Sequence, residues 1–408
     1  MAVTLASSRV EVAVVGRGPV GLASALALSQ AGLQVNLIGA PLPADDEPWD
    51  LRVYALSPAT RELLDAIGVW HALDASRVAP VYDMRVHPAF GSVQRELHLS
   101  AYEGRVEALA WIVEQRNLVG ALEQALRFAR LPVFDDKVAG LDTHGDPLVA
   151  ELRLAGGRRL RARLVVGADG AASRVREAAG LQWSVTDYPQ RALVGHFATE
   201  RPHRDAACQW FGQDGVLALL PLPGPLGEAG GRVSMVWSAP PALADSLQAM
   251  SPAALGERVA AAAGGLLGAM TPISGLAAFP LRLGRASAMT ASRVALVGDA
   301  AHLLHPLAGQ GMNLGFGDVA ALAQTLRGAA AARDPGERLL LRRYERARAE
   351  PVAAMRLVTD GLQRLFDPAG GRLPGLLRPV IDPAVAFGWG AVARSGWLRR
   401  QLVAQAIR

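Results

Sequence analysis

Six residues near the N-terminus have the spacing of a nucleotide-binding turn. Gly16-Arg17-Gly18-Pro19-Val20-Gly21 follows the apolar run 10–15 and precedes an alanine- and leucine-rich stretch that continues to Ala31. In such a strand-turn-helix unit the first glycine permits a tight bend, the second lets the backbone approach a pyrophosphate, and the third lets the helix pack closely on the strand. The helix N-terminus adds unpaired N–H groups. We predict a dinucleotide site at Gly16, Gly18 and Gly21. The alternative is a glycine turn without a ligand.

One expected part of this motif is missing. An acidic residue at the end of the second strand usually binds the ribose hydroxyls of the dinucleotide. Here the second apolar run, 35–38, is followed by Gly39, and the nearest carboxylates, those of Asp45, Asp46 and Glu47, belong to the following loop. The loss of one such contact is expected to weaken dinucleotide binding by on the order of 1–3 kcal/mol without abolishing it.

Two further turns carry an aspartate directly after a predicted buried strand. Asp169 follows the strand predicted over 161–167, and Asp299 follows the strand predicted over 293–297. After Asp299 the chain passes through Pro306, Gly309, Gln310, Gly311 and Met312 to Asn313, where we expect a helix to begin and to continue to Arg327. Each turn places a carboxylate beside a flexible backbone. Either aspartate could instead cap its own turn by local hydrogen bonds.

Elements of two kinds must position these motifs. Strands and helices alternate around the glycine turn, and apolar residues at helical spacing predict a helix over 111–130. From 188 to 283 the apolar runs are short and separated by Gly and Pro, which predicts an antiparallel sheet with strands near 192–198, 215–222, 232–237 and 279–283 and a helix over 253–267. After Pro335 the chain is again predicted to be helical, with Gly- and Pro-rich breaks over 367–375.

Composition excludes several classes of protein. The 408 residues are 51% hydrophobic and 19% charged, which excludes a disordered chain. The net charge of +5 comes from scattered arginines, so no nucleic-acid partner is expected. Cys208 is the single cysteine, and His302 and His305 lack carboxylate or cysteine companions at metal-binding spacing, so no metal site is expected. No signal peptide or transmembrane helix is predicted.

The ordered motifs resemble the class A flavoprotein monooxygenases, of which para-hydroxybenzoate hydroxylase is a member, and within them the ubiquinone-biosynthesis aromatic hydroxylases. The likeness rests on the glycine turn, the two aspartate turns and blocks distributed along the chain. These blocks are Asp50-Leu51-Arg52-Val53-Tyr54-Ala55-Leu56-Ser57, Trp111-Ile112-Val113-Glu114-Gln115-Arg116, Leu220-Pro221-Leu222-Pro223 and Leu398-Arg399-Arg400-Gln401-Leu402.

This resemblance implies a role for each motif. Gly16, Gly18 and Gly21 would hold the FAD pyrophosphate, Arg52 and Arg116 would lie along the cofactor, Asp299 would bind the ribityl chain, and Asp169 would serve FAD and nicotinamide binding. The backbone of Gly309, Gln310, Gly311, Met312 and Asn313 would face the flavin pyrimidine edge, where a helix N-terminus stabilises the negative charge of reduced flavin. Pro306 would wall one flavin face near the reactive carbon. Without the resemblance, Arg52 and Arg116 would be read as ordinary surface arginines.

The resemblance also implies an activity. FAD, reduced by NAD(P)H or by a separate reductase, would react with oxygen to a C4a-hydroperoxide that hydroxylates the aromatic ring of a polyprenylated phenol or quinol in ubiquinone biosynthesis. The apolar runs of the sheet suit such a lipophilic substrate. Other quinone-biosynthesis proteins are candidate partners. We expect a cytoplasmic protein, with peripheral contact to the inner face of the membrane through the basic, tryptophan-bearing segment 384–408 as a hypothesis.

The predicted fold is α/β, with a Rossmann-like FAD-binding domain, an inserted, mostly antiparallel substrate domain and a C-terminal helical region. The FAD-binding domain is expected to be discontinuous over 1–80, 100–185 and 284–330, the substrate domain to comprise 81–99 and 186–283, and the helical region to comprise 331–408. Two alternatives stay open: a different FAD-dependent oxidoreductase, such as a halogenase or a prenyl reductase, or a scaffold that has lost catalysis. The tryptophans do not form the W-x-W-x-I-P motif of halogenases, and Gly39 is the feature that favours a scaffold.

Overall fold

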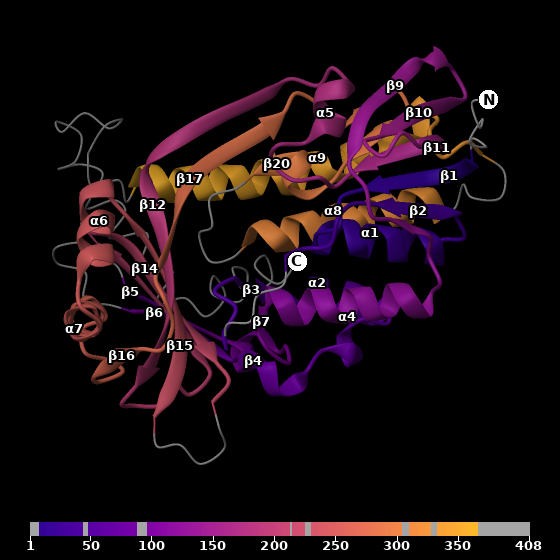
Figure 1. Cartoon of the computed structure of the whole chain (residues 1–408). Coiled ribbons are helices and arrows are strands. Elements are labelled where there is room, and N and C mark those ends of the chain that lie inside the picture. Colours follow the sequence, from indigo (N-terminus) through magenta and orange to yellow (C-terminus); the bar gives the residue numbers. More distant parts are fainter. Residues whose placement is uncertain are drawn as a thin grey trace.

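The computed structural model describes residues 8–43, 48–87, 96–212, 214–224, 230–303, 310–327 and 333–365. Two large sheets lie apart, with the mainly parallel sheet on one side and the antiparallel sheet on the other (Figure 1). No helix in the described ranges is long and apolar enough to cross a membrane.

The first sheet is built around the glycine turn. Its central strands run parallel, and a hairpin of two antiparallel strands extends it. Its strands, in spatial order, are β18 (Thr290–Ala291), β19 (Val294–Leu296), β11 (Arg159–Gly167), β1 (Ser8–Val15), β2 (Val35–Ile38) and β8 (Val133–Phe134), with β10 (Val149–Leu154) on β11 and β9 (Val138–Asp146) on β10. The turns that follow the neighbouring strands β1, β11 and β19 therefore lie at the same edge of the sheet. These turns carry Gly16, Asp169 and Asp299.

Both faces of this sheet are covered. Val12 and Val14 face a core shared with three helices, α1 (Pro19–Gln30), α4 (Gln115–Phe128) and α8 (Gln310–Arg327). Ala13 and Val15 face the β9–β10 hairpin and α5 (Arg174–Ala178). Helix α9 (Arg338–Leu365) packs against α8. A parallel strand buried on two faces needs a continuous apolar run, and residues 12–15 of β1 have one.

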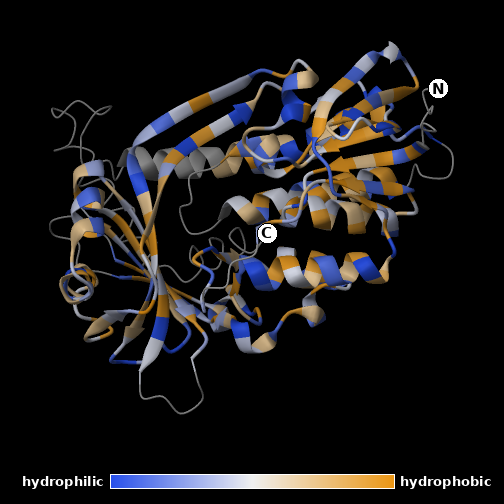
Figure 2. Ribbon diagram, in the orientation of Figure 1, coloured by the Kyte–Doolittle hydropathy of each residue, from blue (hydrophilic) through white to orange (hydrophobic). Residues whose placement is uncertain are grey.

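The second sheet has nine strands, antiparallel except where β13 meets β5. In spatial order they are β20 (His302–Leu303), β17 (Ala277–Ala286), β12 (Trp183–Thr199), β15 (Gly231–Ala239), β14 (Gly215–Leu222), β13 (Ala206–Gly212), β5 (Asp83–His87) and β6 (Leu97–Ser100), with β16 (Met270–Pro272) on β12. The long strands β12 and β17 reach toward α5 (Figure 1), and hydrophobic and hydrophilic residues alternate along them (Figure 2). Helices α6 (Pro241–Ala249) and α7 (Pro252–Ala262) cover one face.

A three-stranded sheet joins the two halves. Its strands are β3 (Val53–Leu56), β7 (Ala110–Glu114) and β4 (Val78–Val81), and α2 (Pro58–Ala66), α3 (Ala101–Gly104) and two 3-10 turns, Trp70–Ala72 and Ala75–Arg77, accompany it. Apolar residues of β3, β4 and β7 share a core with Ala207, Leu220 and Leu222 of the large antiparallel sheet. The division of the chain into an FAD-binding domain, a substrate domain and a helical region stays a prediction.

Two predicted helices differ from the observed ones. The helix predicted over 111–130 begins only at Gln115, because Trp111, Ile112 and Val113 form the buried centre of β7, where aromatic and β-branched residues favour a strand. The helix predicted over 253–267 ends at Ala262, because Gly264 and Gly265 adopt positive φ angles of 61° and 67°, which terminate a helix. The predicted strands near 10–15, 35–38 and 161–167 are confirmed.

Candidate functional site

The glycine turn is tightly constrained at its first and third glycines. Gly16 donates its N–H to the Ile38 carbonyl at 2.8 Å and has a φ of 119°. A Cβ atom added at Gly16 would lie 2.1 Å from the Ala168 carbonyl oxygen, and one added at Gly21 would lie 2.0 Å from the Gly16 carbonyl oxygen. Both positions therefore exclude any side chain, as the nucleotide-binding interpretation predicts.

Gly18 differs from these two glycines. It is the N-cap of α1, its φ is −79°, and no described atom lies within 4 Å of a Cβ added there. Gly18 thus adjoins open space at the N-terminus of α1, whose first-turn N–H groups and dipole favour an anion. A tight turn that opens only at its second glycine matches the shape needed by a dinucleotide pyrophosphate.

The backbone explains why β2 does not end in an acidic residue. Gly39 has a φ of 157°, and a Cβ added there would lie 3.0 Å from the backbone nitrogen of Arg17. The Arg17 side chain instead extends to Glu123 on α4, with Nε 2.9 Å from Oε1, and both side chains are mostly buried. The carboxylates of Asp45 and Asp46 belong to a loop of which 44–47 lie outside the described residues.

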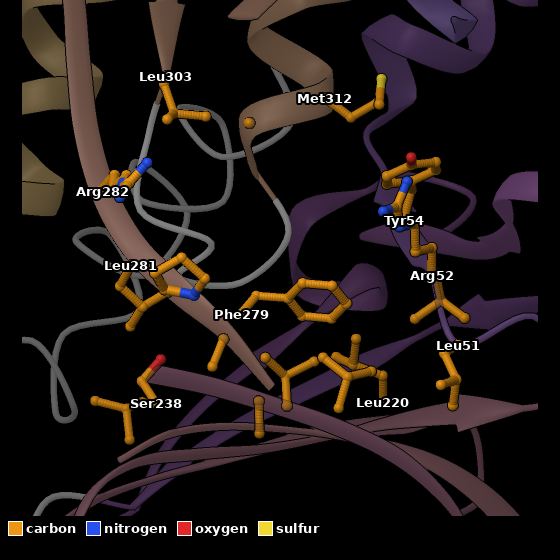
Figure 3. A pocket seen from close by; sticks show the side chains of 18 of the residues that line it. Leu51, Arg52, Tyr54, Leu220, Ser238, Phe279, Leu281, Arg282, Leu303 and Met312 are labelled. Atoms are coloured by element: carbon orange, nitrogen blue, oxygen red, sulfur yellow. The ribbon is translucent and has the colours of Figure 1, made fainter. Parts of the chain in front are cut away.

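A cavity of about 460 Å³ lies between the start of α8 and the antiparallel sheet (Figure 3). It brings together four of the predicted site residues, Arg52, Asp299, Gly311 and Met312, which are far apart in the sequence. On the sheet side, aliphatic side chains of three neighbouring strands form the floor of the cavity. These are Ala192 and Val194 of β12, Val216, Ala218 and Leu220 of β14, and Val236 of β15.

The sheet supplies this apolar floor because side chains alternate between its faces. Val194 pairs with Val236, and Val236 pairs with Ala218, so the three side chains form one row across β12, β15 and β14. Gln209 and Ser238 are polar residues of the same lining, from β13 and β15. A flat or elongated apolar molecule with a few oxygen substituents suits such a surface.

Asp299 lies in the turn after β19 and lines the cavity. The Asp299 side chain is exposed to the cavity, but the protein packed around this turn still raises the pKa of its carboxyl by desolvation, and neighbouring His302 opposes the rise. Gly311 and Met312, in the first turn of α8, also line the cavity. This end therefore combines hydrogen-bonding groups with a helix N-terminus.

A buried ionic network underlies the Asp299 turn. Asp318 of α8 has no exposed surface and accepts hydrogen bonds from the Gly298 N–H at 2.9 Å, from His302 Nε2 at 2.6 Å and from Arg348 Nε at 2.7 Å. His302 is thus a packed residue that ties the turn to α8. No cluster of metal-binding residues is found within the described ranges.

Arg52 and Arg116, both predicted along the cofactor, are held by the same carboxylate. Asp50 Oδ1 accepts the Arg52 N–H at 2.9 Å, and Asp50 Oδ2 accepts the Arg116 N–H at 2.8 Å. The Arg52 side chain enters the cavity, where its guanidinium lies 5.9 Å from the centre of the Phe279 ring. Arg116 is the second residue of α4 and is not part of the cavity lining.

Two other predicted residues, Asp169 and Asn313, have hydrogen-bond partners within the protein. Asp169 caps α5 by accepting the Ser173 hydroxyl at 2.5 Å and the Arg174 N–H at 2.8 Å, the alternative that the sequence left open. Its turn nevertheless adjoins Gly16 through Ala168. Asn313 fixes the start of α8 by donating to the Ala55 carbonyl at 2.8 Å. Pro306 and Gly309 lie outside the described residues, as does the side chain of Gln310, the first residue of α8.

Sequence reasoning gave no role to Tyr54, although it quoted the block that contains this residue. Tyr54 lines the cavity beside Arg52, and its hydroxyl donates to Gln115 Oε1 at 2.5 Å. Burial raises the pKa of this phenol well above its usual range, so Tyr54 stays protonated at neutral pH. An aromatic residue within an otherwise aliphatic strand, β3, was the available signal. Cys208 is buried in β13, and burial raises its pKa to about 11, which excludes a reactive thiolate.

Comparison with known proteins identifies close relatives. A family model described as an FAD binding domain matches residues 9–359. The 3-demethoxyubiquinol 3-hydroxylase of Escherichia coli is 36% identical, over 97% of this chain and 98% of its own length. The ubiquinone hydroxylase UbiL of Rhodospirillum rubrum is also 36% identical, over 97% of this chain and 89% of its own.

Solved structures share the fold. The p-nitrophenol 4-monooxygenase of Pseudomonas putida superposes with a TM-score of 0.73 at 20% identity, covering 98% of both chains. Klebsiella pneumoniae HpxO, solved with FAD and uric acid, gives a TM-score of 0.72 at 18% identity, covering 97% of this chain and 96% of its own. At these identities the likeness supports the fold alone, and the predicted α/β fold class is confirmed.

Proposed function

Because the chain belongs to the FAD-dependent monooxygenases that carry this FAD-binding domain, we propose that it hydroxylates the aromatic ring of a polyprenylated phenol or quinol in ubiquinone biosynthesis. The observation that carries the proposal is the cavity itself. One side presents Arg52, Asp299 and the start of α8, and the opposite side presents an apolar sheet floor. A cofactor bound on the first side would face a lipophilic aromatic ring bound on the apolar floor.

FAD supplies the redox and oxygen chemistry when bound, and the protein supplies binding, orientation and exclusion of water. In our proposal Gly16, Gly18 and Gly21 admit the pyrophosphate at the N-terminus of α1. Asp299 binds the ribityl hydroxyls, and the N–H groups at the start of α8, near Gly311, face the flavin. Positive charge from Arg52 and the dipole of α8 would stabilise negative charge on the bound cofactor.

The sheet side would bind the substrate. The row of Val194, Val236 and Ala218 offers an apolar surface to a prenyl chain or ring face, and Gln209 and Ser238 can bind ring oxygens. Two relatives at 36% identity are named as hydroxylases of ubiquinone or of demethoxyubiquinol, which supports a substrate of this class. Electrons are proposed to come from NAD(P)H or from a separate reductase, and other quinone-biosynthesis proteins are proposed partners.

Complementation tests the proposed reaction. The chain would be expressed in quinone-deficient cells that each lack one ring hydroxylase, and the accumulated intermediates would be identified by mass. We expect one strain to regain ubiquinone and to lose an intermediate 16 mass units lighter than the hydroxylated product, as required by insertion of one oxygen atom. Failure to restore quinone in every strain would contradict the proposal.

Gly39 supports a second candidate function, a scaffold within a quinone-biosynthesis complex. The backbone at this position disfavours the acidic residue that usually binds the ribose, so the chain would lack one contact to the cofactor. Absorbance separates the two candidates. The enzyme is expected to carry a visible flavin spectrum as purified or after addition of FAD, whereas a scaffold that has lost cofactor binding would show none.

Peripheral membrane contact through the segment 384–408 is a further part of the proposal. This segment lies outside the described residues, and its basic and tryptophan residues are the features that support it. Removal of 384–408 is expected to reduce binding to liposomes that contain anionic lipid. Unchanged liposome binding by the truncated protein would argue against this contact.

A further inference from the structure

Asp50 lies two residues before Arg52 and forms hydrogen bonds through its N–H, its carboxylate and its carbonyl oxygen. The Asp50 N–H donates to Glu114 Oε2 at 3.0 Å, and its carboxylate accepts the N–H groups of Arg52 and Arg116. The Asp50 carbonyl oxygen lies 3.0 Å from Nε2 of His196. Glu114 and Arg116 lie at the junction of β7 and α4, whereas His196 lies in β12 of the antiparallel sheet.

His196 therefore joins the substrate-side sheet to the cofactor-side segment. A carbonyl oxygen can only accept, so Nε2 of His196 carries the proton and donates it. His196 has no exposed surface, and burial lowers the pKa of its imidazole, which favours this neutral form. Nδ1 of His196 is buried without a hydrogen-bond partner within the described residues, so the Asp50 contact is the one side-chain hydrogen bond that offsets the burial of the ring.

The place of His196 along β12 links it to the cavity. Ala192 and Val194 line the cavity floor, and His196 is the next residue on the same face, because alternate side chains of a strand share a face. Trp49 covers the His196 ring edge-on, with ring centres 6.1 Å apart. One strand thus carries both the floor under the substrate and the contact to the segment that brings Arg52 into the cavity.

Packing alone does not account for a histidine here. The position is in the interior of a sheet, where a branched apolar residue would fill space without the desolvation of two ring nitrogens. Ser234 lies directly across from His196 on β15, is equally buried, and has a hydroxyl without a partner within the described residues. Ser234 supplies a matched position at which a polar side chain makes no contact with Asp50.

We propose that His196 is a positioning residue that holds the Asp50 carbonyl and, through the Asp50 carboxylate, orients the backbone of Arg52 and Arg116 for FAD binding. This inference rests on the proposed function, because it assigns to the two arginines a place along FAD. It adds a residue of the substrate-side sheet to the determinants of cofactor affinity.

The test compares His196→Leu, His196→Gln and Ser234→Ala. The amide nitrogen of glutamine can reach the position of Nε2, whereas leucine keeps the volume and loses the donor. FAD affinity is measured by the quenching of flavin fluorescence, and the flavin environment by visible circular dichroism. We expect His196→Leu to bind FAD about tenfold more weakly, in line with the loss of one hydrogen bond, and the other two variants to remain within about twofold of the wild type.

A second comparison protects the test against misfolding. If His196→Leu does not fold, His196→Gln is compared with His196→Asn, which is polar but too short to reach the Asp50 carbonyl. Only the glutamine variant is expected to keep the FAD affinity and the visible circular dichroism of the wild type. Equal FAD affinity of all His196 variants would overturn the inference while leaving the proposed function intact. A wild-type protein that binds no FAD would overturn both.

Discussion

Asp318 has no exposed surface, yet it accepts hydrogen bonds from the Gly298 N–H, His302 and Arg348. A buried carboxylate of this kind is tolerated only when its partners balance the cost of desolvation. Here the partners belong to α9 and to the turn that carries Asp299, so one side chain aligns three parts of the candidate site. At the residue scale, the buried polar groups hold the elements that present the cavity residues.

The substitution Asp318→Asn should therefore be costly. It keeps the shape of the side chain but leaves the guanidinium of Arg348, which is 8% exposed, without its counter-charge. We expect the free energy of unfolding in urea to fall by about 3–5 kcal/mol. Asp245→Asn breaks the exposed ion pair with Arg191 and should change this value by no more than about 1 kcal/mol. Similar stability of the two variants would contradict the assigned role of Asp318.

His196 predicts a dependence of stability on pH. Burial lowers the pKa of His196 in the folded protein below the ordinary value of about 6.5 that it regains on unfolding. Between these two values the unfolded chain binds more protons, so stability decreases as the pH falls from 7.5 toward 5. Glu114 and Asp50 oppose the shift but do not cancel it.

Removing this histidine should flatten the dependence. In His196→Gln the loss of unfolding free energy between pH 7.5 and pH 5 is expected to be smaller than in the wild type. Urea unfolding at several pH values measures it. His87, whose pKa is also lowered by burial, is retained in both proteins and so does not affect the comparison. Equal slopes for the two proteins would exclude His196 as a contributor.

At the scale of elements, the β1–α1 unit shows how one short motif serves two purposes. Gly16 and Gly21 are required by the fold itself, because added Cβ atoms would collide with backbone oxygens. Gly18 has an ordinary φ and open space beside it, so the fold alone does not require a glycine there. A ligand that closely approaches the backbone at Gly18 gives the physical reason for this second glycine of the turn.

Alanine substitutions should separate these two purposes. Gly16→Ala is expected to lower the free energy of unfolding by at least about 3 kcal/mol, because φ is 119° and the new Cβ meets the Ala168 carbonyl. Gly18→Ala should leave stability without FAD within about 1 kcal/mol of the wild type and weaken FAD binding by about tenfold or more. Urea unfolding and a fluorescence titration measure the two effects. Normal FAD affinity of Gly18→Ala would contradict a pyrophosphate at this turn.

At the scale of the whole molecule, the cavity exists because two sheets of different construction meet. The parallel sheet and α8 contribute Asp299, Gly311 and Met312, the antiparallel sheet contributes the apolar floor, and β3 contributes Tyr54. A ligand that spans the glycine turn and the cavity would contact several of these parts at once. Its binding should therefore stabilise the folded chain as a unit.

Thermal unfolding with and without ligand tests this expectation. FAD at about one hundred times its dissociation constant should contribute about 2.7 kcal/mol and raise the unfolding temperature. Riboflavin carries the flavin ring but no pyrophosphate, so at the same concentration it should give a much smaller shift. Equal shifts by the two compounds would show that the glycine turn does not take part in binding.

Much of the candidate site was predictable from local patterns. The glycine turn, the two aspartate turns and the strands before them depend on residues within about ten positions of one another. Their types and order predicted a dinucleotide-binding α/β fold, the family resemblance implied FAD, and the comparisons confirm both. The pattern failed at 111–114, where apolar residues at helical spacing form strand β7. There, pairing with β3 and β4 decided the outcome, and such pairing has no signal within the segment.

The sequence by itself therefore determined that a dinucleotide binds and which elements carry the motifs for it, because those features depend on local backbone requirements. Only the tertiary structure decided which residues meet. It placed Asp318 under the Asp299 turn, Tyr54 against Gln115, and His196 against Asp50, by hydrogen bonds that span 16 to 146 positions. Such contacts arise from the packing of sheets and helices around a shared core, and spacing along the chain does not encode them.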